Sequence, residues 1–92
     1  ELMVVDAEAI NYITTIKGER NRIVFHQKKS VECLETSLKV VKQLDLPEYY
    51  KVFKSYIINA RQIKMIDRTN NVLCFFNGEE LEVGKKIRKA IS

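Results

Sequence analysis

Short runs of β-branched and aromatic residues, separated by polar turns, recur along most of the chain, and this pattern restricts its fold more than any other feature. The first run, Ile10 to Ile16, stops at a polar turn around Gly18. The last hairpin signal is Asn77-Gly78 between two strand-like runs, which is typical of a type I′ turn with positive φ at both central residues. The sequence therefore predicts a mainly β, antiparallel domain.

Six segments are predicted as strands, and the first three should form adjacent hairpins because only short polar turns separate them. They are residues 10–16, 22–26, 30–34, 62–67, 72–76 and 80–83. Residues 55–59 suggest a short helical turn or an irregular segment rather than a regular strand, and this choice stays open. The aromatic residues of these runs, Phe76 included, are expected in the core, which argues against an RNA-binding sheet face.

One central helix is expected over residues 37–44, where Thr36 or Ser37 offers an N-cap, apolar residues continue at helical spacing to Leu44, and Pro47 ends the segment. A second, short helix is expected near the C-terminus, from Lys85 to Ile91, because two isoleucines lie four residues apart there. The predicted fold is therefore mainly β with one central helix and a short C-terminal helix.

The chain has the size and composition of one folded domain. Its 92 residues allow one modest core, so residues 1–92 are expected to form a single unit. No run is long and apolar enough for a membrane span, and the acidic start lacks the basic region of a signal peptide, so we expect a cytoplasmic protein without a membrane partner. Cys33 and Cys74 lie in separate apolar runs, which predicts two buried thiols rather than a disulfide framework or a zinc site.

Groups suited to catalysis are sparse. His26 is the only histidine, and without metal-ligand spacing it is interpreted as a structural or surface residue. Glu79, Glu80 and Glu82 are interpreted as a solvated edge of the last hairpin. The three glycines lie singly in turns and form no phosphate-binding loop. We therefore expect no enzymatic activity, no catalytic residue, no metal site and no cofactor.

The basic residues gather in three separated segments of a chain whose net charge is +4. If these segments converge, they form a positive face suited to a polyanion, although lysines scattered for solubility would give the same total charge. The segments are Lys17, Arg20, Arg22, Lys28 and Lys29; then Lys51, Lys54, Arg61, Lys64 and Arg68; then Lys85, Lys86, Arg88 and Lys89.

Residues 52–59, Val-Phe-Lys-Ser-Tyr-Ile-Ile-Asn, resemble the "F-x-x-H-R-S-Y-I-V-N" hallmark of the LytTR family of bacterial DNA-binding domains. Residues 10–13 resemble the family's "I-x-Y-I" strand, and residues 63–66 its next strand. Residues 72–83, with Asn77-Gly78 in the middle, resemble the C-terminal family pattern. The resemblance covers almost the whole chain in order, and it implies a compact antiparallel LytTR-like β fold whose loops and C-terminal region enter successive major grooves of a bent duplex.

The resemblance also implies which residues contact DNA. It puts Asn21 and Arg22 at a groove, with Lys54 and with Lys85 or Lys86 in two further contact positions. The full set of expected DNA-binding residues is Lys17, Arg20, Asn21, Arg22, Lys54, Ser55, Lys85 and Lys86. The chain departs from the pattern at Phe53, where the family has histidine, and at Gly84-Lys85, where it has serine-arginine, so its base preference could differ. Asn59 is expected to bond the backbone rather than DNA.

The family resemblance implies the output domain of a transcription regulator of the two-component or quorum-sensing type. Such a domain would bind double-stranded DNA as a dimer on paired repeats, with a receiver domain preceding it in a longer protein. The resemblance begins only at residue 10, so the family's first strand is expected to be shortened or missing, which fits a fragment of such a protein. The alternative is a protein-interaction module that uses exposed sheet edges and binds no nucleic acid.

Overall fold

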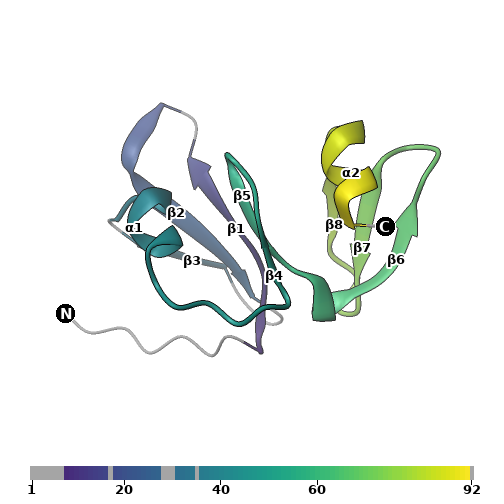
Figure 1. Ribbon diagram of the computed structural model, residues 1–92, viewed down its shortest axis with the longest axis horizontal. Helices are drawn as coiled ribbons and strands as arrows, with labels where there is room; N and C mark the ends of the chain where they lie inside the picture. Colours follow the sequence, from purple (N-terminus) through teal and green to yellow (C-terminus); the bar gives the residue numbers. More distant parts are fainter. Residues whose placement is uncertain (1–7, 17, 28–30, 35, 92) are drawn as a thin grey trace.

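The computed structural model describes residues 8–16, 18–27, 31–34 and 36–91. These residues form eight strands, where six were predicted, with two α-helices and one 3₁₀ turn (Figure 1). In chain order the elements are β1 (Ile10–Ile16), β2 (Glu19–Gln27), β3 (Val31–Leu34), α1 (Leu38–Lys42), β4 (Tyr50–Val52), β5 (Tyr56–Asn59), η1 (Ala60–Gln62), β6 (Ile63–Asp67), β7 (Val72–Phe75), β8 (Glu80–Glu82) and α2 (Lys85–Ile91). The predicted fold class, mainly β with a central and a C-terminal helix, is confirmed.

The strands form two antiparallel sheets. The first has the order β3-β2-β1-β5-β4, and the second has the order β6-β7-β8. The turn η1 leads from β5 of the first sheet into β6 of the second, and the two sheets lie side by side in Figure 1. Helix α1 lies against the first sheet and α2 against the second. The molecule therefore has two halves that meet through β1, β2 and β5 of the first sheet and the last hairpin of the second.

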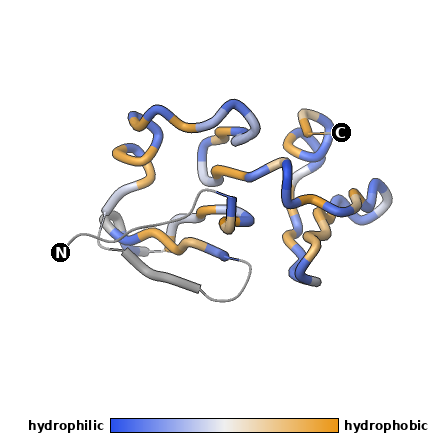
Figure 2. Tube along the Cα trace, turned by 90° about the horizontal axis from the view of Figure 1, so that it is seen from below, coloured by the Kyte–Doolittle hydropathy of each residue, from blue (hydrophilic) through white to orange (hydrophobic). Residues whose placement is uncertain are grey.

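Residues 10–13 of β1 and 57–59 of β5 are buried on both faces of the sheet, because these strands separate two hydrophobic cores. Ile13 pairs with Ile57 and both belong to the core closed by α1, whereas Tyr12 pairs with Ile58 and both belong to the core shared with the second sheet. The first core contains Ile10, Ile13, Ile23, Phe25, Leu38, Val41, Tyr50 and Ile57, and the second contains Tyr12, Ile58, Leu73, Phe75 and Val83. Figure 2 shows the resulting hydrophobic segments in both halves of the molecule.

A bulge interrupts β1 at Asn11. Ile10 pairs with Gln27 and Tyr12 with His26, so β1 has one more residue than β2 between these pairs. A bulge of this kind changes the direction of a side chain relative to regular alternation. Here Asn11 and Tyr12, although consecutive, both contact Glu79, in the connection between β7 and β8 of the second sheet.

Helix α1 begins as predicted but ends early. The Ser37 hydroxyl accepts a hydrogen bond from the Val40 amide at 3.3 Å, which confirms the N-cap. The helix ends at Lys42, and i→i+3 bonds such as Leu44 N to Val41 O tighten its last turn. The helix therefore ends two residues before the predicted end at Leu44, whose side chain is 59% exposed.

Residues 55–59, for which no regular strand was expected, contain the inner strand β5, which lies between β1 and β4. The usual polar-apolar alternation is absent because Ile57 and Ile58 face different cores. Asn59 ends the strand, where its Nδ2 donates to Ile10 O at 2.8 Å and its Oδ1 accepts from the Arg61 amide at 3.0 Å. Its backbone-bonding role is confirmed.

The hairpin between β7 and β8 lies where Asn77-Gly78 predicted it, but it is not type I′. Of this pair only Gly78 has positive φ, at 92°. Phe75 O accepts from Gly78 N at 3.0 Å and Phe75 N donates to Glu79 O at 2.8 Å, so residues 76–78 form a three-residue loop with a glycine bulge. The longer loop leaves Phe76 63% exposed, which corrects its expected burial.

Helix α2 confirms the predicted C-terminal helix and closes the second core. Its two isoleucines, Ile87 and Ile91, pack against that core, as their four-residue spacing requires. Neither this helix nor α1, within the described part of the chain, is long and apolar enough to cross a membrane.

Candidate nucleic-acid interface

The connection between β1 and β2 is tighter than the polar loop expected between the predicted strands 10–16 and 22–26. Gly18 has a φ of 84°, and β2 already begins at Glu19. Between the pairs Ile16 with Glu19 and Thr15 with Ile23, β1 advances by one residue and β2 by four. The predicted extent of the loop was therefore wrong, but residues 20–22 form an irregularity that regular pairing with β1 does not constrain.

Only part of this candidate segment has a described side chain. Lys17 lies outside the described residues, and so do the side chains of Arg20 and Asn21. The exposed Arg22 donates from Nη1 to Glu19 Oε1 at 3.1 Å. With side chains 46% and 41% exposed, this pair is screened by solvent and contributes about 0–1 kcal/mol.

The turn between β4 and β5 presents Lys54 and Ser55 to solvent. The Phe53 amide donates to Tyr56 O at 2.8 Å and closes this turn, and Lys42 Nζ of α1 donates to Lys54 O at 3.0 Å. Because Tyr56 pairs with Thr14, the turn lies at the end of β1 that leads to the β1–β2 connection.

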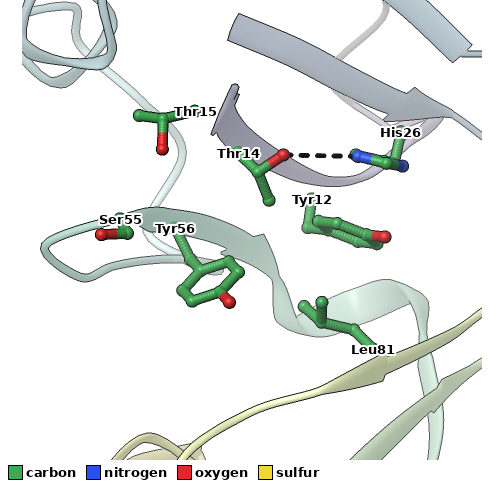
Figure 3. A pocket seen from close by; sticks show the side chains of 7 residues that line it. All are labelled: Tyr12, Thr14, Thr15, His26, Ser55, Tyr56 and Leu81. Atoms are coloured by element: carbon green, nitrogen blue, oxygen red, sulfur yellow. Dashed lines mark hydrogen bonds between the residues drawn. The ribbon is translucent and has the colours of Figure 1, made fainter. Parts of the chain in front are cut away.

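Two cavities connect this turn with its neighbours. The first, of about 310 Å³, is lined by Thr15 of β1 and Ser55 at one end and by Tyr12, His26 and Leu81 at the other (Figure 3). The second, of about 400 Å³, has both Lys54 of the turn and Lys86 of α2 in its lining, together with Phe53 and Gly84. The structure thus brings the second and third basic segments together at these two lysines.

Other basic residues of the second segment have different surroundings. Arg61 donates from Nη1 to Glu8 Oε1 at 3.1 Å, and its guanidinium lies 4.2 Å from the centre of the Tyr49 ring. Lys64 and Arg68 line a separate cavity beside β6. Arg61 is thus held by partners near the start of β1, and Lys64 and Arg68 line a cavity that contains neither Lys54 nor Lys86.

A polar junction between the two sheets was missed by the sequence interpretation. Glu79, which the sequence placed on a solvated edge, accepts hydrogen bonds from Asn11 Nδ2 at 2.9 Å and from Tyr12 OH at 3.4 Å, and its Oε2 lies 3.3 Å from His26 Nδ1. The His26 and Glu79 side chains are only 20% and 26% exposed. His26 is thus a structural residue, one of its two expected roles, whereas Glu80 and Glu82 are exposed as expected.

The Tyr12 ring is central to this junction. It stacks on His26, with 4.0 Å between ring centres and 13° between planes, and packs on Phe75 at 5.5 Å. Burial raises the pKa of the Tyr12 phenol well above its usual range, and the charge and hydrogen bond of Glu79 raise it further. No sequence pattern links these residues, because more than 50 positions separate Glu79 from each of its three partners.

These features define a two-sheet β domain with lysines from two distant segments at one cavity and, in the described residues, no cluster of groups suited to holding a metal ion. The whole chain, residues 1–92, matches the family described as the LytTr DNA-binding domain. The protein therefore belongs to the LytTR family, which is a family of DNA-binding domains and not of enzymes.

A solved structure supports the fold assignment. The chain is similar to the "LytTr DNA-binding domain of putative methyl-accepting/DNA response regulator" from Bacillus cereus, with a TM-score of 0.74 and 18% sequence identity, over 94% of this chain and 80% of that one. At this identity the likeness shows the fold alone. No curated protein sequence matches the chain.

Proposed function

We propose that the domain reads double-stranded DNA with the end of the molecule that carries the β1–β2 connection, the β4–β5 turn and the start of α2. The observation that carries this proposal is the shared cavity of Lys54 and Lys86, because it joins cations from distant parts of the chain beside Ser55. The irregular segment 20–22 follows the end of β1 at which Ser55 lies. Two contact elements therefore belong to the first sheet, and the third belongs to the helix on the second.

The side chains at these positions have complementary tasks. Asn21 can pair with both hydrogen-bonding groups of an adenine edge, and Arg22 or Lys86 can donate to guanine O6 and N7. Lys17, Arg20, Lys54, Ser55 and Lys85 suit the phosphates, since hydroxyl and cationic groups position a protein on the backbone. Phe53 replaces the histidine of the family pattern within the lining of the cavity, so we expect a base preference that differs from the family's.

In a complete protein, this domain would serve as the output domain of a cytoplasmic transcription regulator of the two-component or quorum-sensing type. The Bacillus cereus protein of similar fold is named as a putative response regulator, which supports this role. We expect a receiver domain to precede the domain and two copies to bind paired repeats. These assignments make duplex DNA the partner and require no cofactor.

Salt dependence tests the DNA interface as a whole. If about five phosphates are neutralised, log K should fall with log salt concentration with a slope of about −4 to −5. Fluorescence anisotropy with a labelled duplex selected from a random pool measures this slope. Binding that hardly changes with salt would refute a phosphate-contacting surface.

Substitution of Lys86 tests the assigned residues. Lys86→Ala should weaken binding to the selected duplex by about 1–3 kcal/mol and reduce discrimination against random duplex, because a base contact is lost. Asn21→Ala should behave in the same way. Lys64→Ala is the matched control, since it removes the same charge from a cavity that contains none of the proposed contact residues. Equal selectivity in Lys86→Ala, Asn21→Ala and wild type would refute the assignment.

A further inference from the structure

We propose that Glu79 is a positioning residue for DNA recognition: it holds the second sheet, and with it α2, at the distance from the first sheet that lets both halves contact one duplex. This inference rests on the proposed DNA interface, because two of its contact elements belong to the first sheet and the third to α2. Glu79 itself is not expected to contact DNA.

The contacts of Glu79 run from one half of the molecule to the other. Its carboxylate belongs to the β7–β8 hairpin, and its partners are Asn11 and Tyr12 of β1 and His26 of β2. The Tyr12 and His26 rings stack in parallel, which fixes the direction of two of the three partners (Figure 3). Both oxygens are used, since Asn11 bonds Oε1 whereas Tyr12 and His26 contact Oε2. The carboxylate is therefore constrained in orientation as well as in distance.

Irregular backbone on each side of the junction makes this arrangement possible. The bulge in β1 allows Asn11 and Tyr12 to reach the same carboxylate, and the three-residue loop at Gly78 brings Glu79 to them. Asn77 Oδ1 accepts from the Glu79 amide at 3.0 Å and from Asn11 Nδ2 at 3.2 Å, so the loop itself is bonded to the bulge. Both departures from regular β structure thus meet at the same point.

The buried amide of Asn11 helps to orient the loop that contains Asn77 and Glu79, and it does so at a cost to the stability of the fold. Its side chain is fully buried, and its Oδ1 has no hydrogen-bond partner among the described residues. A buried acceptor without a partner lowers the stability of the fold, and an apolar side chain would avoid this loss. What the amide provides instead is a donor shared between Asn77 and Glu79.

Hydrophobic contacts alone would fix the relative position of the halves less sharply. The second core joins the sheets through residues such as Ile58 and Leu73, but burial of apolar surface has no preferred direction. Hydrogen bonds depend strongly on distance and angle. The polar junction is therefore the directional part of the connection between the halves.

Glu79→Gln against Glu80→Gln is the sharpest test. Both variants remove one negative charge, but Glu80 is an exposed residue at the start of β8. The probe is a duplex enriched from a random pool by the wild-type chain, compared with unselected duplex. We expect Glu79→Gln to bind the enriched duplex about tenfold more weakly than Glu80→Gln. Both variants should bind unselected duplex equally well, because the substitution displaces α2 from its sequence-specific contact and removes no cation.

A second test uses an enriched duplex with one base pair inserted between the two stretches that the protein contacts. A general loss of protein stability would not change how binding responds to this insertion. The insertion displaces one stretch by about 3.4 Å and rotates it by about 35°. Wild type and Glu80→Gln should lose at least about tenfold in affinity on insertion, whereas Glu79→Gln should lose much less. Equal losses in all three proteins would overturn the positioning role.

A distance measurement separates this inference from the proposed function. Nitroxide labels at Lys39→Cys on α1 and Lys64→Cys on β6, with both native cysteines replaced by serine, report the separation of the halves by pulsed electron paramagnetic resonance. Glu79→Gln should broaden the distance distribution and Glu80→Gln should not; equal widths overturn the inference even if DNA binds as proposed. A wild-type chain without sequence preference overturns the proposed function instead, and the role in DNA recognition with it.

Discussion

The dipeptide Gly-Glu occurs in two hairpin connections of this domain, Gly18-Glu19 and Gly78-Glu79, and the two glutamates have opposite environments. Both glycines have positive φ, 84° and 92°, so the backbone requirement of the two turns is similar. Glu19 pairs with the exposed Arg22 of its own strand, whereas Glu79 is bound by three side chains of the other sheet. Turn chemistry therefore determines where a hairpin forms, while tertiary context determines what its acidic residue does.

The difference has a functional side under the proposed DNA interface. The first turn leads into the irregular segment 20–22, whose partner would be DNA. The second turn has its partner within the molecule. The outward turn, Gly18-Glu19, suits DNA recognition because its ion pair is exposed to solvent. The inward turn, Gly78-Glu79, suits the positioning of the two halves on which recognition depends.

Removal of each glutamate should show the largest contrast. Glu79→Ala removes the carboxylate that Tyr12 and His26 contact, and it leaves Asn11 only Asn77 as an acceptor, so we expect it to lower the free energy of unfolding by about 2–3 kcal/mol. Glu19→Ala removes one exposed pair and should change stability by less than about 0.5 kcal/mol. Urea denaturation followed by circular dichroism measures both. Similar losses would show that the two environments are energetically equivalent.

Replacement of the two glycines should have a smaller and nearly equal effect. An added Cβ meets no atom within 4 Å at Gly18 or Gly78, so the cost comes from the positive φ alone. We expect Gly18→Ala and Gly78→Ala each to destabilise by about 1–2 kcal/mol in the same denaturation assay. A much larger loss at Gly78 would indicate that its loop also tightens around Glu79, and would sharpen the distinction between the turns.

Local signals predicted much of this fold, and their failures share a physical cause. The hairpin at Asn77-Gly78, the Ser37 cap and the C-terminal helix depend on neighbouring residues, so sequence reasoning found them. Strand β5 escaped it because burial on both faces removes the alternation that marks a strand.

The same limit applies to the candidate site. The basic segments were visible in the sequence, but the meeting of Lys54 with Lys86 is a property of the tertiary fold. The contacts of Glu79 also depend on partners far away in the chain and on a bulge in β1 that no local sequence pattern predicts. Family resemblance supplied the contact positions that composition and spacing did not.

Alkaline titration should reveal the smallest effect, which belongs to the inward turn alone. Burial and then Glu79 raise the pKa of Tyr12 in the folded state. The unfolded phenol has a pKa of about 10, so the contribution of the neutral Tyr12 phenol to stability is complete below about pH 10. This contribution is lost as the pH rises through the pKa of Tyr12 in the folded state. Ultraviolet absorbance should show Tyr12 ionising late, and Tyr12→Phe should remove that step while costing less than about 1 kcal/mol at neutral pH.

Glu79→Gln provides the decisive comparison for this titration. Loss of the carboxylate charge should move the late step to lower pH without abolishing it, because burial, the larger cause, remains. Glu19→Gln should leave the late step in place, since Glu19 pairs with Arg22 at the other turn and is not among the groups that act on Tyr12. If both variants shifted the step equally, the long-range charge of the domain rather than the Glu79 contact would set the ionisation of Tyr12, and the contrast between the two turns would not extend to their electrostatics.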